Sequence, residues 1–121
     1  MEKWEIEIKL KFQAMPFRMN IRFCFEWKAW LIAYDLFNVG PEEFSKMEAD
    51  TQITALAYGA AYWGRMKRGK KIFFSYEDIA FALNKATKEE NKRIMDAFSH
   101  AQFPEWLKKG MPEDKKKVKT K

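Results

Sequence analysis

Histidine and cysteine, the residues that most often carry catalysis or hold a metal, occur once each, as His100 and Cys24. A serine triad needs a histidine beside a nucleophile, and no nucleophile motif accompanies His100, which falls within a predicted helix. Cys24 has apolar neighbours, where a thiol normally packs as a small hydrophobic side chain. One cysteine also excludes an intramolecular disulfide and a four-cysteine zinc site. We therefore expect neither residue to be catalytic, and we predict no metal and no cofactor.

Carboxylates occur in three adjacent pairs, Glu42-Glu43, Glu77-Asp78 and Glu89-Glu90. Paired carboxylates can perform acid–base chemistry, but each of these pairs falls in the first turn of a predicted helix. The positive end of the helix dipole favours negative charge at that place. Helix stabilisation explains all three pairs, and the chain is predicted not to be an enzyme.

Five cations lie within seven positions at the end of a predicted helix: Arg65, Lys67, Arg68, Lys70 and Lys71. Such a cluster could bind phosphates without sequence specificity and with a steep salt dependence. The alternative is a solvated helix end, where the helix dipole stabilises cations. Gly64 and Gly69 give the spacing of a phosphate-binding loop, but the segment follows a helix, and Lys71 stands where magnesium needs Ser or Thr. We reject the phosphate loop and keep nucleic-acid binding as an alternative.

Aromatic residues recur at helical spacing in a helix predicted from Asn20 to about Phe37. One stripe contains Phe23, Trp27, Trp30, Tyr34 and Phe37. A second apolar surface of the same helix contains Ile21, Cys24, Phe25, Leu31, Ile32 and Leu36. A helix that is apolar on nearly all sides lies centrally in a core or binds a partner. Because Trp and Tyr are favoured interface anchors, we predict that the stripe binds protein, together with Tyr58 and Tyr62. The alternative is that both surfaces pack within the chain.

The N-terminal segment predicts a strand. Apolar and charged residues alternate from Trp4 to Phe12, which is the pattern of a half-buried strand with a polar outer face. Met15-Pro16-Phe17 is the only nearby candidate for a return strand. If it does not pair, the free edge invites pairing with another subunit.

The rest of the chain predicts helices. Pro41 suits the first position of a short helical turn, and a longer helix is predicted over about 49–66. Capping boxes at Ser75 and Thr87 begin two further helices, the last of which stops at Pro104. The predicted fold class is α+β, mainly α, with an N-terminal strand or hairpin followed by about four helices.

The chain of 121 residues fits one domain, which we assign to residues 1–109. Its net charge of +6 is concentrated near the end, because residues 104–121 hold seven Lys and three acidic residues, a balance of +4. Residues 110–121 are expected to form a disordered basic tail. The start has no apolar signal-peptide core, and the longest apolar run, 29–34, is too short to span a bilayer. We therefore expect a cytoplasmic protein without a membrane partner.

Several segments follow one another in a characteristic order. The predicted strand leads through Phe17-Arg18-Met19-Asn20 into Phe23-Cys24-Phe25-Glu26 of the aromatic helix. The next helix contains residues 53–60, and a short helix opens within residues 74–79. The last helix is formed by residues 91–102. Over residues 4–103 this order resembles the tail assembly chaperones of long-tailed bacteriophages. Two departures are the basic character of residues 61–68 and the number of Trp residues in the aromatic helix.

The resemblance implies a protein of the host cell cytoplasm that binds the tape measure protein and promotes assembly of the tail tube protein around it. It implies a surface for apolar helices, no catalytic residues, and absence from the finished virion. A homo-oligomer is expected because the strand edge and the aromatic stripe both offer interfaces. The alternatives are a small phage or bacterial nucleic-acid-binding regulator, and a structural virion connector or tail-completion protein.

Overall fold

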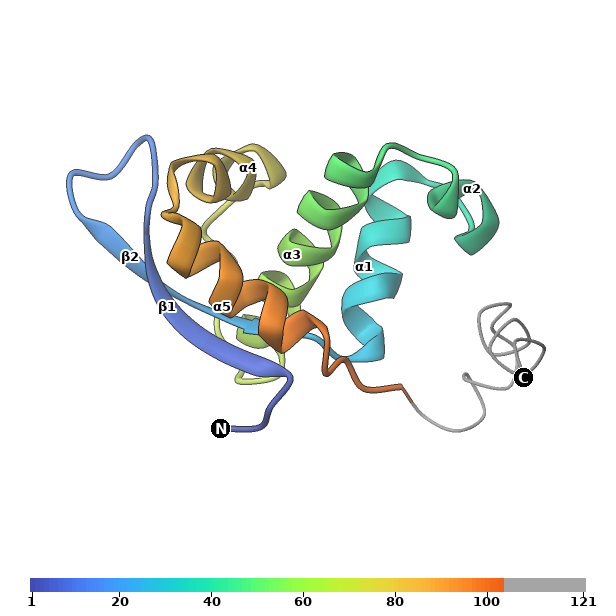
Figure 1. The fold of residues 1–121 in the computed structure, drawn as a ribbon, viewed down its shortest axis with the longest axis horizontal. Coiled ribbons are helices and arrows are strands. Elements are labelled where there is room, and N and C mark those ends of the chain that lie inside the picture. The colour runs from blue at the N-terminus through green and yellow to red at the C-terminus, as the bar shows by residue number, and fades with distance from the viewer. Residues whose placement is uncertain (104–121) are drawn as a thin grey trace.

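The computed structural model describes residues 1–103 and consists of an antiparallel hairpin followed by five helices (Figure 1). This confirms the predicted α+β, mainly α, fold class. The elements are β1 (Glu5–Lys11), β2 (Arg18–Cys24), α1 (Trp27–Phe37), α2 (Pro41–Ser45), α3 (Ala49–Met66), α4 (Tyr76–Lys85) and α5 (Lys88–Phe98). The predicted tail, 110–121, and the domain boundary at 109 lie outside the described residues.

The return strand differs from the prediction. Met15-Pro16-Phe17 belongs to the connection, and β2 occupies residues that were predicted to begin a helix at Asn20. Ile8 pairs with Ile21, so the apolar residues of the two strands share one face. The apolar positions of this segment fit both a helical and a strand period, and the strand prevails because β1 needs a partner. The helix begins only at Trp27, after Glu26 at its N-cap.

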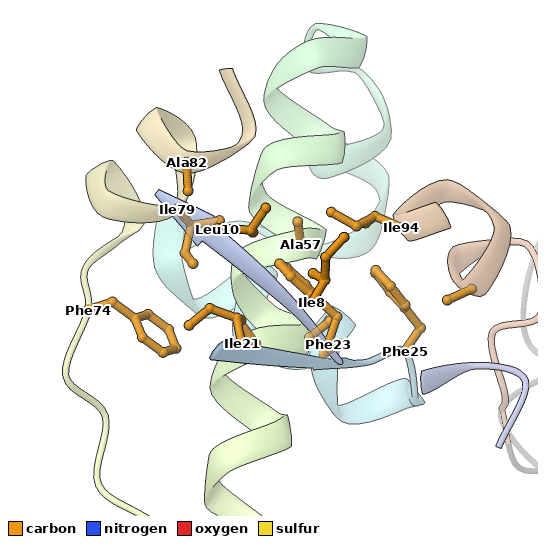
Figure 2. Packing of buried hydrophobic residues seen from close by; sticks show 14 of the residues in the cluster. Ile8, Leu10, Ile21, Phe23, Phe25, Ala57, Phe74, Ile79, Ala82 and Ile94 are labelled. Carbon is orange, nitrogen blue, oxygen red and sulfur yellow. The ribbon is translucent and has the colours of Figure 1, made fainter. Parts of the chain in front are cut away.

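The core lies between the inner face of the hairpin and three helices. Ile8, Leu10, Ile21 and Phe23 are all buried on the hairpin. Figure 2 shows them facing Ala57 of α3, Ile79 and Ala82 of α4, and Ile94 of α5, with Phe74 closing one side. A second, smaller cluster of Ala33, Phe44, Ala55 and Leu56 joins α2 to α1 and α3. The hairpin is therefore held on the helices by its apolar face.

Helix α3 packs so closely against α1 and β2 that its backbone touches theirs. A Cβ atom on Gly59 would overlap the carbonyl oxygen of Ala29 in α1, and one on Gly64 would overlap the carbonyl oxygen of Arg22 in β2. Both glycines are buried on α3. No larger residue fits these positions without a backbone shift, because the close-packed interior leaves no room. The predicted bounds of this helix, 49–66, are confirmed.

Helices α4 and α5 begin as predicted. Ser75 accepts from the Asp78 amide and Thr87 from the Glu90 amide, and each carboxylate accepts from the backbone of its capping residue in return. Helix α5 ends at Phe98, earlier than the predicted stop at Pro104. The chain leaves the helix because the Gln102 amide donates to the carbonyl oxygen of Phe25, 3.0 Å away. Residues 99–103 thus return to the start of α1.

Candidate functional site

The predicted aromatic stripe does not form one surface. Phe23 is a β2 residue with no exposed area, so its prediction as a protein-binding residue is wrong. Trp30 stacks on Phe98 with ring centroids 5.8 Å apart, and it meets Phe103 in a T-shaped contact with ring centroids 4.8 Å apart. This part of the stripe therefore packs against the C-terminal end of the described chain.

The next two rings of the stripe also pack within the protein. Tyr34 contacts Phe44 of α2 edge to face at 5.3 Å, and Phe37 contacts Tyr76 of α4 at 5.8 Å. Trp27 is half-buried beside Lys28, whose Nζ lies 5.6 Å from its ring centroid. Most of the stripe belongs to intramolecular packing, which is the alternative that the sequence left open.

An open groove lies on another side of α1, where α1 runs beside α3 (Figure 1). It is lined by Leu31, Ile32, Asp35 and Leu36 of α1 and by Tyr58 and Tyr62 of α3. We call it the α1–α3 groove. Leu31 is 46% exposed and Leu36 is 36% exposed, although both are large apolar side chains. The groove therefore brings together the two predicted tyrosines and three residues of the second apolar surface.

Small residues produce this groove. Ala29 and Ala33 are fully buried on α1, and Gly59 of α3 meets the Ala29 backbone, so the two helix axes lie close together. The larger side chains that flank the contact then form the two walls. Small residues were the signal in the sequence for the packed helix faces: Ala29 and Ala33 lie four residues apart on α1, and Gly59 lies on α3. The exposed flank beside them, with Leu31 and Leu36, could have been inferred from it.

The walls of the groove are mainly apolar, with few polar groups. Among the lining residues within 1–103, Asp35 is the one that carries a charge. Tyr58 and Tyr62 lie edge to face at 5.7 Å. Burial raises the pKa of Tyr58, and the nearby Tyr62 and Glu77 add to the effect, so its hydroxyl stays neutral and able to donate. Such a surface suits apolar anchors with a few hydrogen bonds.

A second notable group, which we call the Glu26 cluster, surrounds the start of α1. Glu26 accepts hydrogen bonds from the Trp63 indole at 2.8 Å and from the Trp4 indole at 3.2 Å. The Lys67 ammonium lies 3.1 Å from Glu26 and 3.4 Å from Glu5. Cys24 donates to Glu5 at 3.3 Å. The cluster ties β1, β2, α1 and the end of α3 together.

The protonation states in this cluster favour a structural role. Burial alone would raise the pKa of Glu26, but the hydrogen bonds from Trp63, Lys67 and Trp4 outweigh it and hold the pKa below its usual value. Burial and the charge of Glu26 raise the pKa of Cys24 to about 12, so the thiol stays protonated. A protonated thiol is a poor nucleophile.

The same cluster has the donor types of a metal site. Ligand atoms of Glu5, Cys24 and Glu26 all lie within 4.8 Å of one another. However, the Lys67 ammonium already contacts all three residues, with its Nζ 3.5 Å from the Cys24 sulfur. That ammonium supplies the cation for the two carboxylates, and metal binding needs a thiolate that the raised Cys24 pKa disfavours. We assign no metal to this cluster.

The five predicted cations differ in whether they have partners within the protein. Lys67 is held by the Glu26 cluster. The Arg65 guanidinium lies 4.7 Å from the Phe73 ring centroid and donates to the Lys71 carbonyl oxygen, and Arg68 donates to the Gly64 carbonyl oxygen at 2.8 Å. Lys70 and Lys71 are exposed. Arg65, Lys67 and Arg68 therefore already interact with groups of the protein itself.

The α1–α3 groove is thus the candidate functional site, because exposed apolar side chains line one hollow there. Among residues 1–103, no helix combines the length and apolar content that crossing a membrane requires. Comparisons with protein-family models, with curated proteins and with solved structures find no match to this chain.

Proposed function

We propose that this protein binds an amphipathic helix of a partner in the α1–α3 groove and performs no catalysis. The observation that carries the proposal is the exposure of Leu31 and Leu36 along a groove whose opposite wall is formed by Tyr58 and Tyr62. Single exposed apolar residues are common on soluble proteins and need no explanation. Their alignment along one hollow between two helices is the arrangement that captures helical segments.

The length of the groove indicates the size of the bound segment. Its α1 wall extends from Leu31 to Leu36, a rise of about 8 Å at 1.5 Å per residue. About one and a half turns of a partner helix fit along this distance, with two or three apolar anchors. So few anchors support weak and reversible binding at one position, because affinity depends on a small number of well-buried side chains.

The most specific form of the proposal is a phage tail assembly chaperone. Its support is the resemblance of residues 4–103 to that family, together with a groove suited to apolar helices. The proposed partners are the tape measure protein, a long helical protein, and the tail tube protein that assembles around it, in the host cell cytoplasm. Weak binding at many positions would keep a long apolar helix soluble and still allow its release.

The nucleic-acid alternative has less support. Arg65, Lys67 and Arg68 contact a ring, carboxylates and a carbonyl of the protein itself, which leaves a smaller free cationic surface. A structural virion component would use the same groove for a permanent contact. Its presence in purified particles would separate it from a chaperone.

The test is co-purification from cells that produce the phage, with the full chain carrying a tag. The groove variant is Leu31→Glu with Leu36→Glu, and the matched control is Met95→Glu, which changes a residue of α5 that is 39% exposed. We expect the wild type and the control to recover a long, helix-rich phage protein at moderate salt, and the groove variant to lose it. Equal recovery by all three, or recovery only of nucleic acid that salt removes, would contradict the proposal.

A further inference from the structure

The charges of α1 stand at the unfavourable ends of its dipole. Lys28 is in the first turn, where the helix dipole favours an acidic residue, and Asp35 is in the last turn, where it favours a basic one. By contrast, α2, α3, α4 and α5 each carry at least one acidic residue in the first turn. Helix stability therefore does not explain the placement of these two charges on α1.

Contacts within the protein do not explain Asp35 either. Asp35 is exposed, and no ion pair joins it to a side chain of residues 1–103. Lys28 has a partial explanation, because its Nζ lies 4.7 Å from the Trp63 ring centroid. The ammonium nevertheless finds no carboxylate within that part of the chain. Within residues 1–103, both charges therefore lack an oppositely charged side chain and can pair with a bound molecule.

The two charges lie on one side of α1. They are separated by seven residues, which is about two helical turns and a rise of about 10 Å. Asp35 lines the groove, and Leu31 lies between it and Lys28. A helix bound beside α1 would therefore place its apolar anchors against Leu31 and its flanking residues against the two charges.

We infer that the bound helix carries an acidic residue that faces Lys28 and, seven residues later, a basic residue that faces Asp35, with apolar anchors between them. This inference rests on the proposed function and adds the chemistry and direction of the partner. An acidic residue toward the N-terminus and a basic residue toward the C-terminus also suit the partner helix's own dipole. Such a helix lies parallel to α1.

The test is a charge-exchange cycle between Asp35 and a synthetic peptide helix. One peptide has Glu at position i, Leu at i+3 and i+4, and Lys at i+7, and the second differs only in Glu at i+7. Each is titrated into the wild-type chain and into Asp35→Lys, with affinity measured at low salt by calorimetry. The wild type is expected to prefer the Lys peptide by about fivefold, the scale of a surface ion pair, and Asp35→Lys to prefer the Glu peptide.

The stability of the variant gives a second readout. Asp35→Lys places a favourable charge in the last turn of α1, so its Tm is expected to rise by a few degrees while binding of the Lys peptide weakens. Equal affinity of both peptides for both proteins would overturn the inference and leave groove binding intact. If neither peptide binds the wild type, or if Leu31→Glu binds them as well as the wild type, the proposed function fails instead.

Discussion

Helix α1 has two apolar sides that differ in how far the rest of the protein covers them. On one side Trp30, Tyr34 and Phe37 are partly covered by α2, α4, the end of α5 and the segment after it. On the other side Leu31 and Leu36 stay exposed in the α1–α3 groove. The side richer in aromatic residues is the covered one. Residue type alone therefore did not decide which side is exposed, because later segments of the chain cover only one of them.

The largest effect on stability is expected at the close contact between α1 and α3, which lies between the two sides of α1. Gly59→Ala should destabilise the protein by about 3 kcal/mol, since its Cβ would overlap the Ala29 carbonyl oxygen and force α1 away from α3. Urea unfolding measures the change. Gly40→Ala is the matched control, because a Cβ there meets no atom within 4 Å. Equal stability of both variants would mean that α1 and α3 are farther apart than described.

Adjacent residues test the difference between the two sides. Trp30→Ala should cost about 2–3 kcal/mol, because its ring packs on Phe98 and Phe103. Leu31→Ala, one residue later on the exposed side, should change stability by about 0.5 kcal/mol or less. Thermal unfolding of the two variants checks this. Similar losses would show that the groove is covered in solution.

Acid should weaken the Glu26 cluster, which lies at the start of α1, and so lower the stability of the protein. Glu5 and Glu26 have lowered pKa values in the folded protein, for Glu26 because its hydrogen bonds outweigh the effect of burial. A lowered folded pKa contributes stability that is present above the unfolded pKa and is lost as pH falls through the folded pKa. Stability should therefore fall as the pH drops below about 4.5, and Glu26→Gln should make this fall shallower. An unchanged pH profile in Glu26→Gln would contradict the described hydrogen bonds.

The smallest effect concerns the chemistry of Cys24. Because the pKa of its buried thiol is raised to about 12, the native protein should react very slowly with an alkylating reagent at pH 8. Reaction should become fast in urea. Gly59→Ala should react faster than Gly40→Ala, since less stable protein opens more often. Rapid labelling of the native wild type would mean that the Glu26 cluster is open to solvent.

Local signals in the sequence predicted part of the fold. The capping boxes at Ser75 and Thr87 and the bounds of α3 are confirmed, because caps and amphipathic period depend on residues close in sequence. Strand β2 was missed because its apolar residues also fit a helix, and only its pairing with β1 decides between the two. The end of α5 was missed because it depends on Gln102 meeting Phe25.

The candidate site could be predicted less well than the fold. Tyr58 and Tyr62 were named, and both line the groove. The prediction of Phe23, Trp30, Tyr34 and Phe37 rested on aromatic residues at helical spacing, but their exposure depends on segments far along the chain. Leu31, Ile32 and Leu36 were grouped with residues of β2, since the helix was predicted to start too early.

The order of the elements also bears on how the chain folds during synthesis. The hairpin is complete at Cys24, but its apolar face is covered only when α3, α4 and finally Ile94 of α5 are available. The roughly 70 residues between Cys24 and Ile94 take several seconds to translate at about 5–20 residues per second. During that time Ile8, Leu10, Ile21 and Phe23 have no cover from the later helices. The apolar face of the nascent hairpin is thus open to aggregation during this time, and rapid synthesis would shorten that exposure.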